Sequence, residues 1–345
     1  MDDIKRHPIS LTEVLRARKA VYSRLTPSPL LEYIGLSELI GASVYIKHEN
    51  HHPTGSFKIR GGVNLMSHLK ARDVAGVITF STGNHGISIA CAASWFGVDS
   101  VVVVPQNNNP VKNRMIRQSG AELIEAGGTF EEAANVVERL CESRSLYYVH
   151  PANEPHLING VGTGFLEVIE DLPDIDAVIV PIGAGSEAAA AITTLKNINS
   201  KIEIYAVQSS SSPAAYLSWK KGVIVEAPNS TFAGGFATGI AYDLPFSIYK
   251  ENLEDLVILS EEEIYQGIAL AGFYTHNLVE GAGGAPIMAA LKLKDKLKGK
   301  KVVLQFSGCN ASSDEIRRAY QHSYFSSGYK KIMPWTRQDC CRIWR

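Results

Sequence analysis

Short apolar runs that alternate with helical segments along the chain limit most strongly what this sequence can fold into. Runs that are apolar at nearly every position are typical of parallel strands, because helices cover both faces of such a sheet. They occur in both halves of the chain, which predicts two α/β domains with ligands bound beyond the carboxyl ends of the strands. The predicted strands cover residues 43–49, 76–82, 100–105, 121–127, 146–151, 177–183, 202–208, 256–260 and 301–307.

Charge and hydropathy argue against two classes of function. The 345 residues carry a formal net charge of -1, so the chain has no general basic field for nucleic acid. No apolar run reaches the length of a membrane span. The sequence begins MDDIKRHPISLTEVL, which lacks the apolar core of a signal peptide, and we expect a cytoplasmic protein with no nucleic-acid or membrane partner.

Glycine-rich turns follow several of the predicted strands. STGNHG (81–86) and GAGSEAAAA (183–191) each join a strand to a helix, whose first N–H groups and positive dipole end favour a carboxylate or a phosphate. The second turn also fits a relaxed dinucleotide pattern at Gly183, Gly185 and Ala188, with Glu203 about twenty residues further on. An NAD-binding oxidoreductase therefore stays open at this point. A third turn, SGCN (307–310), follows the last predicted strand.

Lys58 lies in the segment HHPTGSFKIRGG, between Phe57 and Ile59. If this segment packs inward, the amine is partly desolvated, and desolvation lowers the pKa of an ammonium group. A neutral amine can form an imine with an aldehyde, which is how pyridoxal 5'-phosphate is held in enzymes. The alternative is an ordinary surface lysine, the usual place of this residue type.

The motifs PTGSFKIRGG, STGNHG, GAGSE and SGCN together resemble those of the pyridoxal-phosphate-dependent fold type II family, within it the threonine/serine dehydratase and serine racemase group. The resemblance runs from about Leu11 to Tyr320. It implies two open, twisted, mostly parallel sheets covered by helices, with the cofactor between two domains. The implied large domain is discontinuous (1–70 and 152–325), the small domain covers 71–151, and 326–345 form a loosely attached tail.

The resemblance also implies roles for individual residues. Lys58 would hold the cofactor and then act as base on the substrate Cα proton. Asn84 would contact the phenolic oxygen of the cofactor, and Ser307 would face the ring nitrogen. Phe57, Gly235 and Glu280 would lie against the ring. The implied phosphate loop consists of Gly183, Ala184, Gly185 and Ser186, and the implied substrate-carboxylate pocket of Ser81, Thr82, Gly83, Asn84 and His85.

The expected reaction is β-elimination of water from a 3-hydroxy L-amino acid such as threonine or serine, giving a 2-oxo acid and ammonia. Ile59 after the lysine and His85 after Asn84 resemble the dehydratase and racemase side of the family rather than its synthases. A racemase with the same site stays open, because Thr82 stands where racemases of this family carry a serine that serves as second base. A related substrate is also open, such as 3-hydroxyaspartate or a hydroxyectoine-pathway intermediate.

The sequence departs from the family pattern in two places. Ala184 and Ser186 replace glycines of the phosphate loop and Glu187 follows, where a carboxylate beside a phosphate must turn away. These departures leave open an amino-acid binder without catalysis. The divalent metal site of serine racemases would fall near Gln208 and Ala214, neither of which is acidic, and we expect no metal. By the resemblance, we also expect a homodimer.

Overall fold

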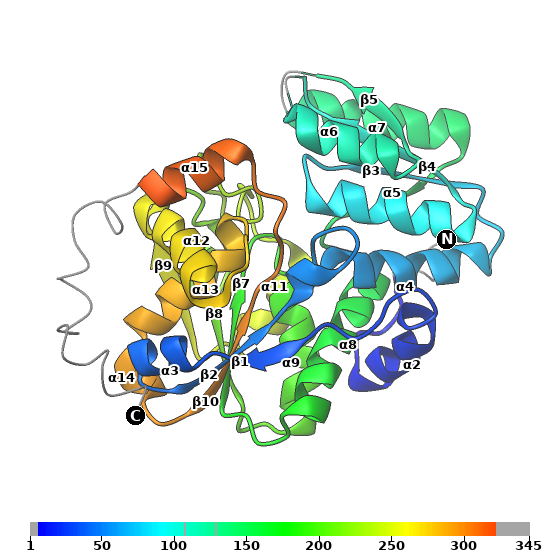
Figure 1. Ribbon diagram of the computed structural model, residues 1–345. Helices are drawn as coiled ribbons and strands as arrows, with labels where there is room; N and C mark the ends of the chain where they lie inside the picture. The colour runs from blue at the N-terminus through cyan, green and yellow to red at the C-terminus, as the bar shows by residue number, and fades with distance from the viewer. Residues whose placement is uncertain (1–5, 107, 128–129, 322–345) are drawn as a thin grey trace.

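The computed structural model describes residues 6–321 except 107, 128 and 129, and the predicted tail at 326–345 lies outside these residues. Two sheets form separate layers, joined mainly by helix α4 (Lys58–Lys70) between them (Figure 1). Both sheets are mainly parallel and carry helices on both faces, which confirms the predicted fold class. Among the described residues, no helix is both long and apolar enough to cross a membrane.

The smaller sheet has four parallel strands in the order β5-β4-β3-β6. Valines and isoleucines of β3 and β4 alternate between its faces, so each face buries an apolar layer. Helices α5 and α6 cover one face and α7 covers the other. The elements are β3 (Gly76–Phe80), α5 (Asn84–Phe96), β4 (Asp99–Val104), α6 (Pro110–Gln118), β5 (Glu122–Glu125), α7 (Phe130–Arg144) and β6 (Tyr147–Tyr148).

The larger sheet has six strands in the order β1-β2-β10-β7-β8-β9, of which only β1 is antiparallel to its neighbour. Helices α3, α12 and α13 pack on one face, and α8, α9 and α11 on the other. Its strands are β1 (Leu30–Glu32), β2 (Ser43–Lys47), β7 (Ala177–Pro181), β8 (Glu203–Ser209), β9 (Asp255–Leu259) and β10 (Lys301–Gln305). The helices are α3 (Ile34–Ile40), α8 (Pro155–Asp171), α9 (Ser186–Ile198), α10 (Ala214–Lys221), α11 (Asp243–Tyr249), α12 (Glu261–Thr275), α13 (Gly281–Lys292) and α14 (Lys294–Leu297), together with α2 (Leu11–Val21), α15 (Ser313–Gln321) and the short η1 (Glu49–His51), which follows β2.

Each predicted strand appears in the structure, within a few residues of its expected ends. Strand β1 was not predicted. It is three residues long and pairs antiparallel with β2 at the sheet edge, so it shows neither the length nor the uninterrupted apolar pattern of the buried strands.

Candidate active site

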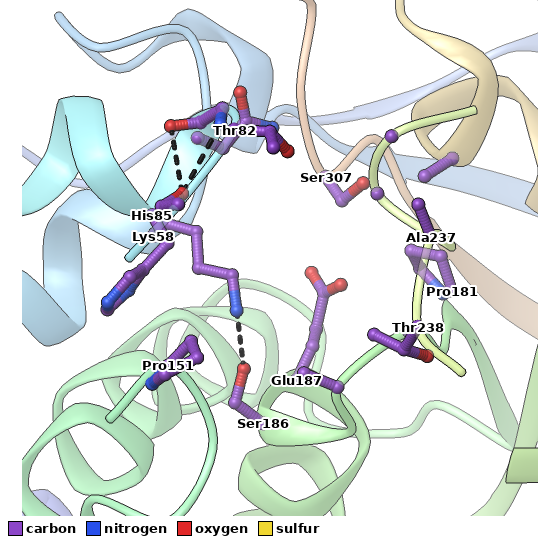
Figure 2. Close-up of a pocket in the computed structure, with 18 of the residues that line it drawn as sticks. Lys58, Thr82, His85, Pro151, Pro181, Ser186, Glu187, Ala237, Thr238 and Ser307 are labelled. Atoms are coloured by element: carbon purple, nitrogen blue, oxygen red, sulfur yellow. Dashed lines mark hydrogen bonds between the residues drawn. The ribbon is translucent and has the colours of Figure 1, made fainter. Parts of the chain in front are cut away.

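A cavity of about 180 Å³ lies between the loops at the carboxyl ends of the two sheets (Figure 2). All the site residues expected from the sequence line it, although they come from segments as far apart as Phe57 and Ser307. The cavity is lined by Phe57, Lys58, Ser81, Thr82, Gly83, Asn84, His85, Gly183, Ala184, Gly185, Ser186, Gly235, Glu280 and Ser307, together with Phe80, Lys112, Pro151, Pro181, Glu187, Gly234, Ala237, Thr238, Tyr242 and Ala282.

Lys58 is the first residue of α4, and its side chain reaches across the cavity to the glycine-rich loop. Its Nζ donates a hydrogen bond of 2.8 Å to Ser186 Oγ and lies 4.8 Å from the centre of the Phe57 ring. The backbone just before Lys58 is held by the end of the neighbouring strand β10, because the Phe57 N–H donates a hydrogen bond to the carbonyl of Ser307. Burial lowers the pKa of Lys58 to about 8, against the opposing charge of Glu187. The amine can therefore be neutral near physiological pH.

A buried ion-pair network fixes the start of α4. Arg60, two residues after the lysine, is fully buried and donates at 2.6 Å to both Glu49 and Glu167. Lys47 of β2 donates to the same Glu167 at 2.7 Å. Burial alone would lower the pKa of Arg60, but the two carboxylates outweigh it and raise that pKa. The network joins η1, β2 and α8 to α4 at a residue only two positions after the lysine.

Close contact between α4 and α8 depends on two glycines. A Cβ on Gly61 would lie 2.8 Å from the Leu157 carbonyl oxygen, and one on Gly160 would lie 2.6 Å from the Arg60 carbonyl oxygen. The backbones of the two helices are therefore in direct contact close to Lys58, which leaves no room for a side chain at either glycine.

The STGNHG turn joins β3 to α5 and forms the wall of the cavity opposite the glycine loop. Ser81 Oγ accepts hydrogen bonds from the N–H groups of Gly83 and Gly86, so its side chain holds the turn in shape. Asn84 bridges the two layers: its Oδ1 accepts from Asn310 at 2.9 Å, and its Nδ2 donates to Glu280 at 2.5 Å. The turn can offer a carboxylate its hydroxyls and the N–H groups at the start of α5.

The imidazole of His85 helps to hold the STGNHG turn in place. Its Nε2 lies 2.9 Å from Thr79 Oγ1, whose hydroxyl donates to the Val149 carbonyl. Burial lowers the pKa of His85 to about 3, with a further contribution from the charge of Lys58. The ring is therefore neutral, and its Nε2 is already engaged with Thr79.

The turn at 183–186 has the form of a phosphate cradle. A Cβ on Gly183 would lie 2.1 Å from the Gly235 carbonyl oxygen, and Gly185 has a φ of +91°, so both positions require glycine. Ala184 fits because its φ is not positive. Helix α9 begins at Ser186, so its free N–H groups and dipole face the cavity. These residues fit the phosphate group of pyridoxal 5'-phosphate, and Lys58 fits its aldehyde.

Two further residues predicted from the sequence, Ser307 and Glu280, also line the cavity. Ser307 follows the end of β10, is 3% exposed, and points into the cavity (Figure 2). Glu280 precedes α13 and is 5% exposed. Burial raises the pKa of Glu280, and the charge of Lys112 and the hydrogen bond from Asn84 oppose this.

Two charged residues of the cavity were not assigned from the sequence. Lys112 lies in the first turn of α6. Its Nζ is close to Gly83 and Gly234, because a Cβ added to either glycine would lie 3.4 Å from it. The signal was present, because α6 follows β4 and β4 neighbours β3, so the loops after both strands meet at one edge. Glu187 was expected to turn away from the loop, and instead its carboxyl group points into the cavity between Lys58 and Ser307 (Figure 2).

Comparisons with known proteins agree with this site. Residues 21–308 match the family described as "Pyridoxal-phosphate dependent enzyme". An L-threonine ammonia-lyase of Thermotoga maritima is 34% identical over 96% of this chain and 80% of its own length. A maize serine racemase structure superposes with a TM-score of 0.86 at 25% identity, covering 90% of this chain and 96% of that one. A threonine deaminase isoform of Solanum lycopersicum gives 0.84 at 30% identity, covering 90% and 94%. The chain belongs to the pyridoxal-phosphate-dependent enzymes of fold type II.

Proposed function

We propose that the protein is a threonine/serine ammonia-lyase, which eliminates water from a 3-hydroxy L-amino acid to give a 2-oxo acid and ammonia. The observation that carries this is the position of the Lys58 amine, 2.8 Å from Ser186 of the phosphate cradle and facing the STGNHG wall across one cavity. The relatives named threonine ammonia-lyase and threonine deaminase match nearly the whole chain, which supports this chemistry over NAD binding or a site without catalysis.

The bound cofactor supplies an electron sink for the carbanion left when the Cα proton is removed. Lys58 takes that proton, for which a pKa of about 8 suits it. The turn at 81–85 holds the substrate carboxylate and thereby orients the Cα–H bond. Asn84 would contact the cofactor's phenolic oxygen, and the neutral hydroxyl of Ser307 would face its ring nitrogen. A hydroxyl is a weak partner there, which favours prompt loss of the β-hydroxyl.

A racemase is the second candidate, favoured by one observation. Thr82 lines the cavity on the STGNHG wall, apart from Lys58, and could return a proton to the opposite face of Cα (Figure 2). The maize neighbour is titled a serine racemase. Both reactions share proton removal by Lys58 and differ only in what happens to the carbanion.

The assay that tests this uses purified enzyme, pyridoxal 5'-phosphate and L-serine, L-threonine or L-threo-3-hydroxyaspartate in deuterated water. We expect 2-oxo acid and ammonia from serine or threonine, with little D-enantiomer. If D-amino acid forms faster than 2-oxo acid, the proposed function changes from lyase to racemase. If neither product forms and no deuterium is exchanged at Cα, both proposed reactions are contradicted.

The assembly that we propose is a cytoplasmic homodimer. Ile34 is 73% exposed and Leu278 is 57% exposed, and the contact of Gly35 with Tyr274 places α3 beside the end of α12. An apolar surface of this kind favours association of two copies. Sedimentation should give twice the chain mass, and Ile34→Glu should give monomers, whereas a monomeric native protein would contradict the dimer.

A further inference from the structure

Glu187 is a buried acid in the cofactor cavity with no role in the chemistry derived above. It follows the phosphate cradle at the second residue of α9, is 3% exposed, and points into the cavity. Its Oε1 has no hydrogen-bond partner among the described residues. A buried, unpartnered carboxyl oxygen costs free energy unless a ligand satisfies it or a proton neutralises it.

The groups around Glu187 come from four elements. Lys58 of α4 is the cation, Glu49 of η1 and Glu280 before α13 are acids, and Gln305 of β10 donates a hydrogen bond. Burial raises the pKa of Glu187 well above its usual value, Glu49 and Glu280 add to this, and Lys58 and Gln305 oppose it. Among the described residues that act most strongly on Glu187, Lys58 is the positive charge that favours the ionised form.

Binding of the cofactor changes this balance. The cradle at 183–186 receives a phosphate carrying nearly two negative charges directly beside Glu187, and the aldehyde engages the amine of Lys58. Two like charges in one cavity disfavour each other, which favours the uptake of a proton by one of them. A protonated carboxyl group also becomes a hydrogen-bond donor, which a phosphate oxygen accepts well.

We propose that Glu187 takes up a proton from solvent when the cofactor phosphate binds, and then serves as a neutral hydrogen-bond donor to that phosphate. Cofactor binding by this enzyme is therefore coupled to pH through Glu187. The proposal concerns cofactor capture and is independent of which amino acid is the substrate.

Inorganic sulfate is a suitable probe, because it resembles phosphate, has no titratable proton near neutral pH, and does not react with Lys58. Its inhibition constant against cofactor binding is measured by the cofactor absorbance of the protein at several pH values from about 7 to 9. For the native protein, the constant should rise by up to about tenfold per pH unit, because each bound sulfate requires one proton. For Glu187→Gln, the slope should fall by the share that belongs to Glu187, and any slope that remains belongs to Lys58, whose pKa of about 8 lies in the same range.

Matched variants assign the proton. Glu38→Gln, which alters an exposed glutamate of α3, should keep the slope of the native protein. Glu187→Leu gives a second neutral side chain should the glutamine variant fold poorly. A flat native profile, or an unchanged slope in both Glu187 variants, would overturn the proposal. The deamination assay tests the proposed reaction separately: if the enzyme deaminates threonine, the proposed reaction stands whatever the sulfate profiles show.

Discussion

Arg60 and Glu167 form an ion pair of 2.6 Å entirely inside the protein, between the helix that carries Lys58 and the helix α8 below it. Removal of one partner leaves the other charged and buried, which costs about 3–5 kcal/mol. We expect Glu167→Gln to lower the free energy of unfolding by about this amount, as measured by urea denaturation. Arg117→Ala, which breaks a surface pair with Glu125, should change it by less than about 1 kcal/mol. Equal losses in the two variants would contradict the structural role of the network.

Replacement of Lys58 by alanine should abolish turnover while the fold survives. Loss of the amine removes both the attachment of the cofactor and the base, and we expect a fall in kcat of at least about 10³-fold. Lys70→Ala, at the exposed end of the same helix, should turn over normally. The 2-oxo acid assay and the cofactor absorbance report the two roles separately. Full activity in Lys58→Ala would move the active site elsewhere.

The phosphate cradle should not tolerate a side chain at Gly183. An alanine Cβ there would lie 2.1 Å from the carbonyl oxygen of Gly235, so the two backbones must separate. We expect Gly183→Ala to weaken cofactor binding by more than about tenfold, measured by equilibrium dialysis, since overpacking of this kind costs about 1–3 kcal/mol. Gly239→Ala is the control, because its Cβ meets its nearest neighbour at an ordinary 3.5 Å.

Lys112 should act on substrate binding rather than on proton removal. It lies beside Gly83 of the proposed carboxylate pocket, where its charge attracts an anionic substrate. We expect Lys112→Ala to raise KM by about tenfold with a smaller change in kcat. Lys112→Arg, which keeps the positive charge, should have a KM close to that of the native enzyme. A fall in kcat at unchanged KM would instead place Lys112 in the chemical step.

The rate of cofactor capture should follow the ionisation of Lys58. Only the neutral amine attacks an aldehyde, and its pKa of about 8 means that capture speeds up with rising pH until about that value and then levels off. The charge of Glu187 raises this pKa, so Glu187→Gln should move the midpoint to lower pH. Borohydride trapping of the lysine–cofactor bond over time gives the rate. An unshifted midpoint would show that Glu187 does not act on the amine.

The sequence predicts the buried strands and the glycine turns well, because both depend on local patterns. It also predicts which residues gather at the cavity, since parallel strands bring the loops at their carboxyl ends together. It does not predict the direction of Glu187 or the burial of Glu49 and Glu167. A glutamate on a helix is usually solvated, and only the tertiary partners Arg60 and Lys58 distinguish these from surface residues.

Helix α4 packs on α5 of the smaller layer and on α8 of the larger one, and it bears the lysine at its first residue. Its contact with α8 is backbone on backbone and is joined by buried ion pairs, whereas the STGNHG turn meets the larger layer through side chains such as Asn84 and Glu280. Helix α5 is held to α4 just as closely, because Ser88 of α5 donates a hydrogen bond of 2.7 Å to the carbonyl of Lys58, and a Cβ on Gly62 of α4 would lie 3.0 Å from the Ser88 carbonyl oxygen. The backbone of Lys58 is therefore tied to both layers, so a shift of one layer against the other would reach the residue that we propose as the attachment point of the cofactor.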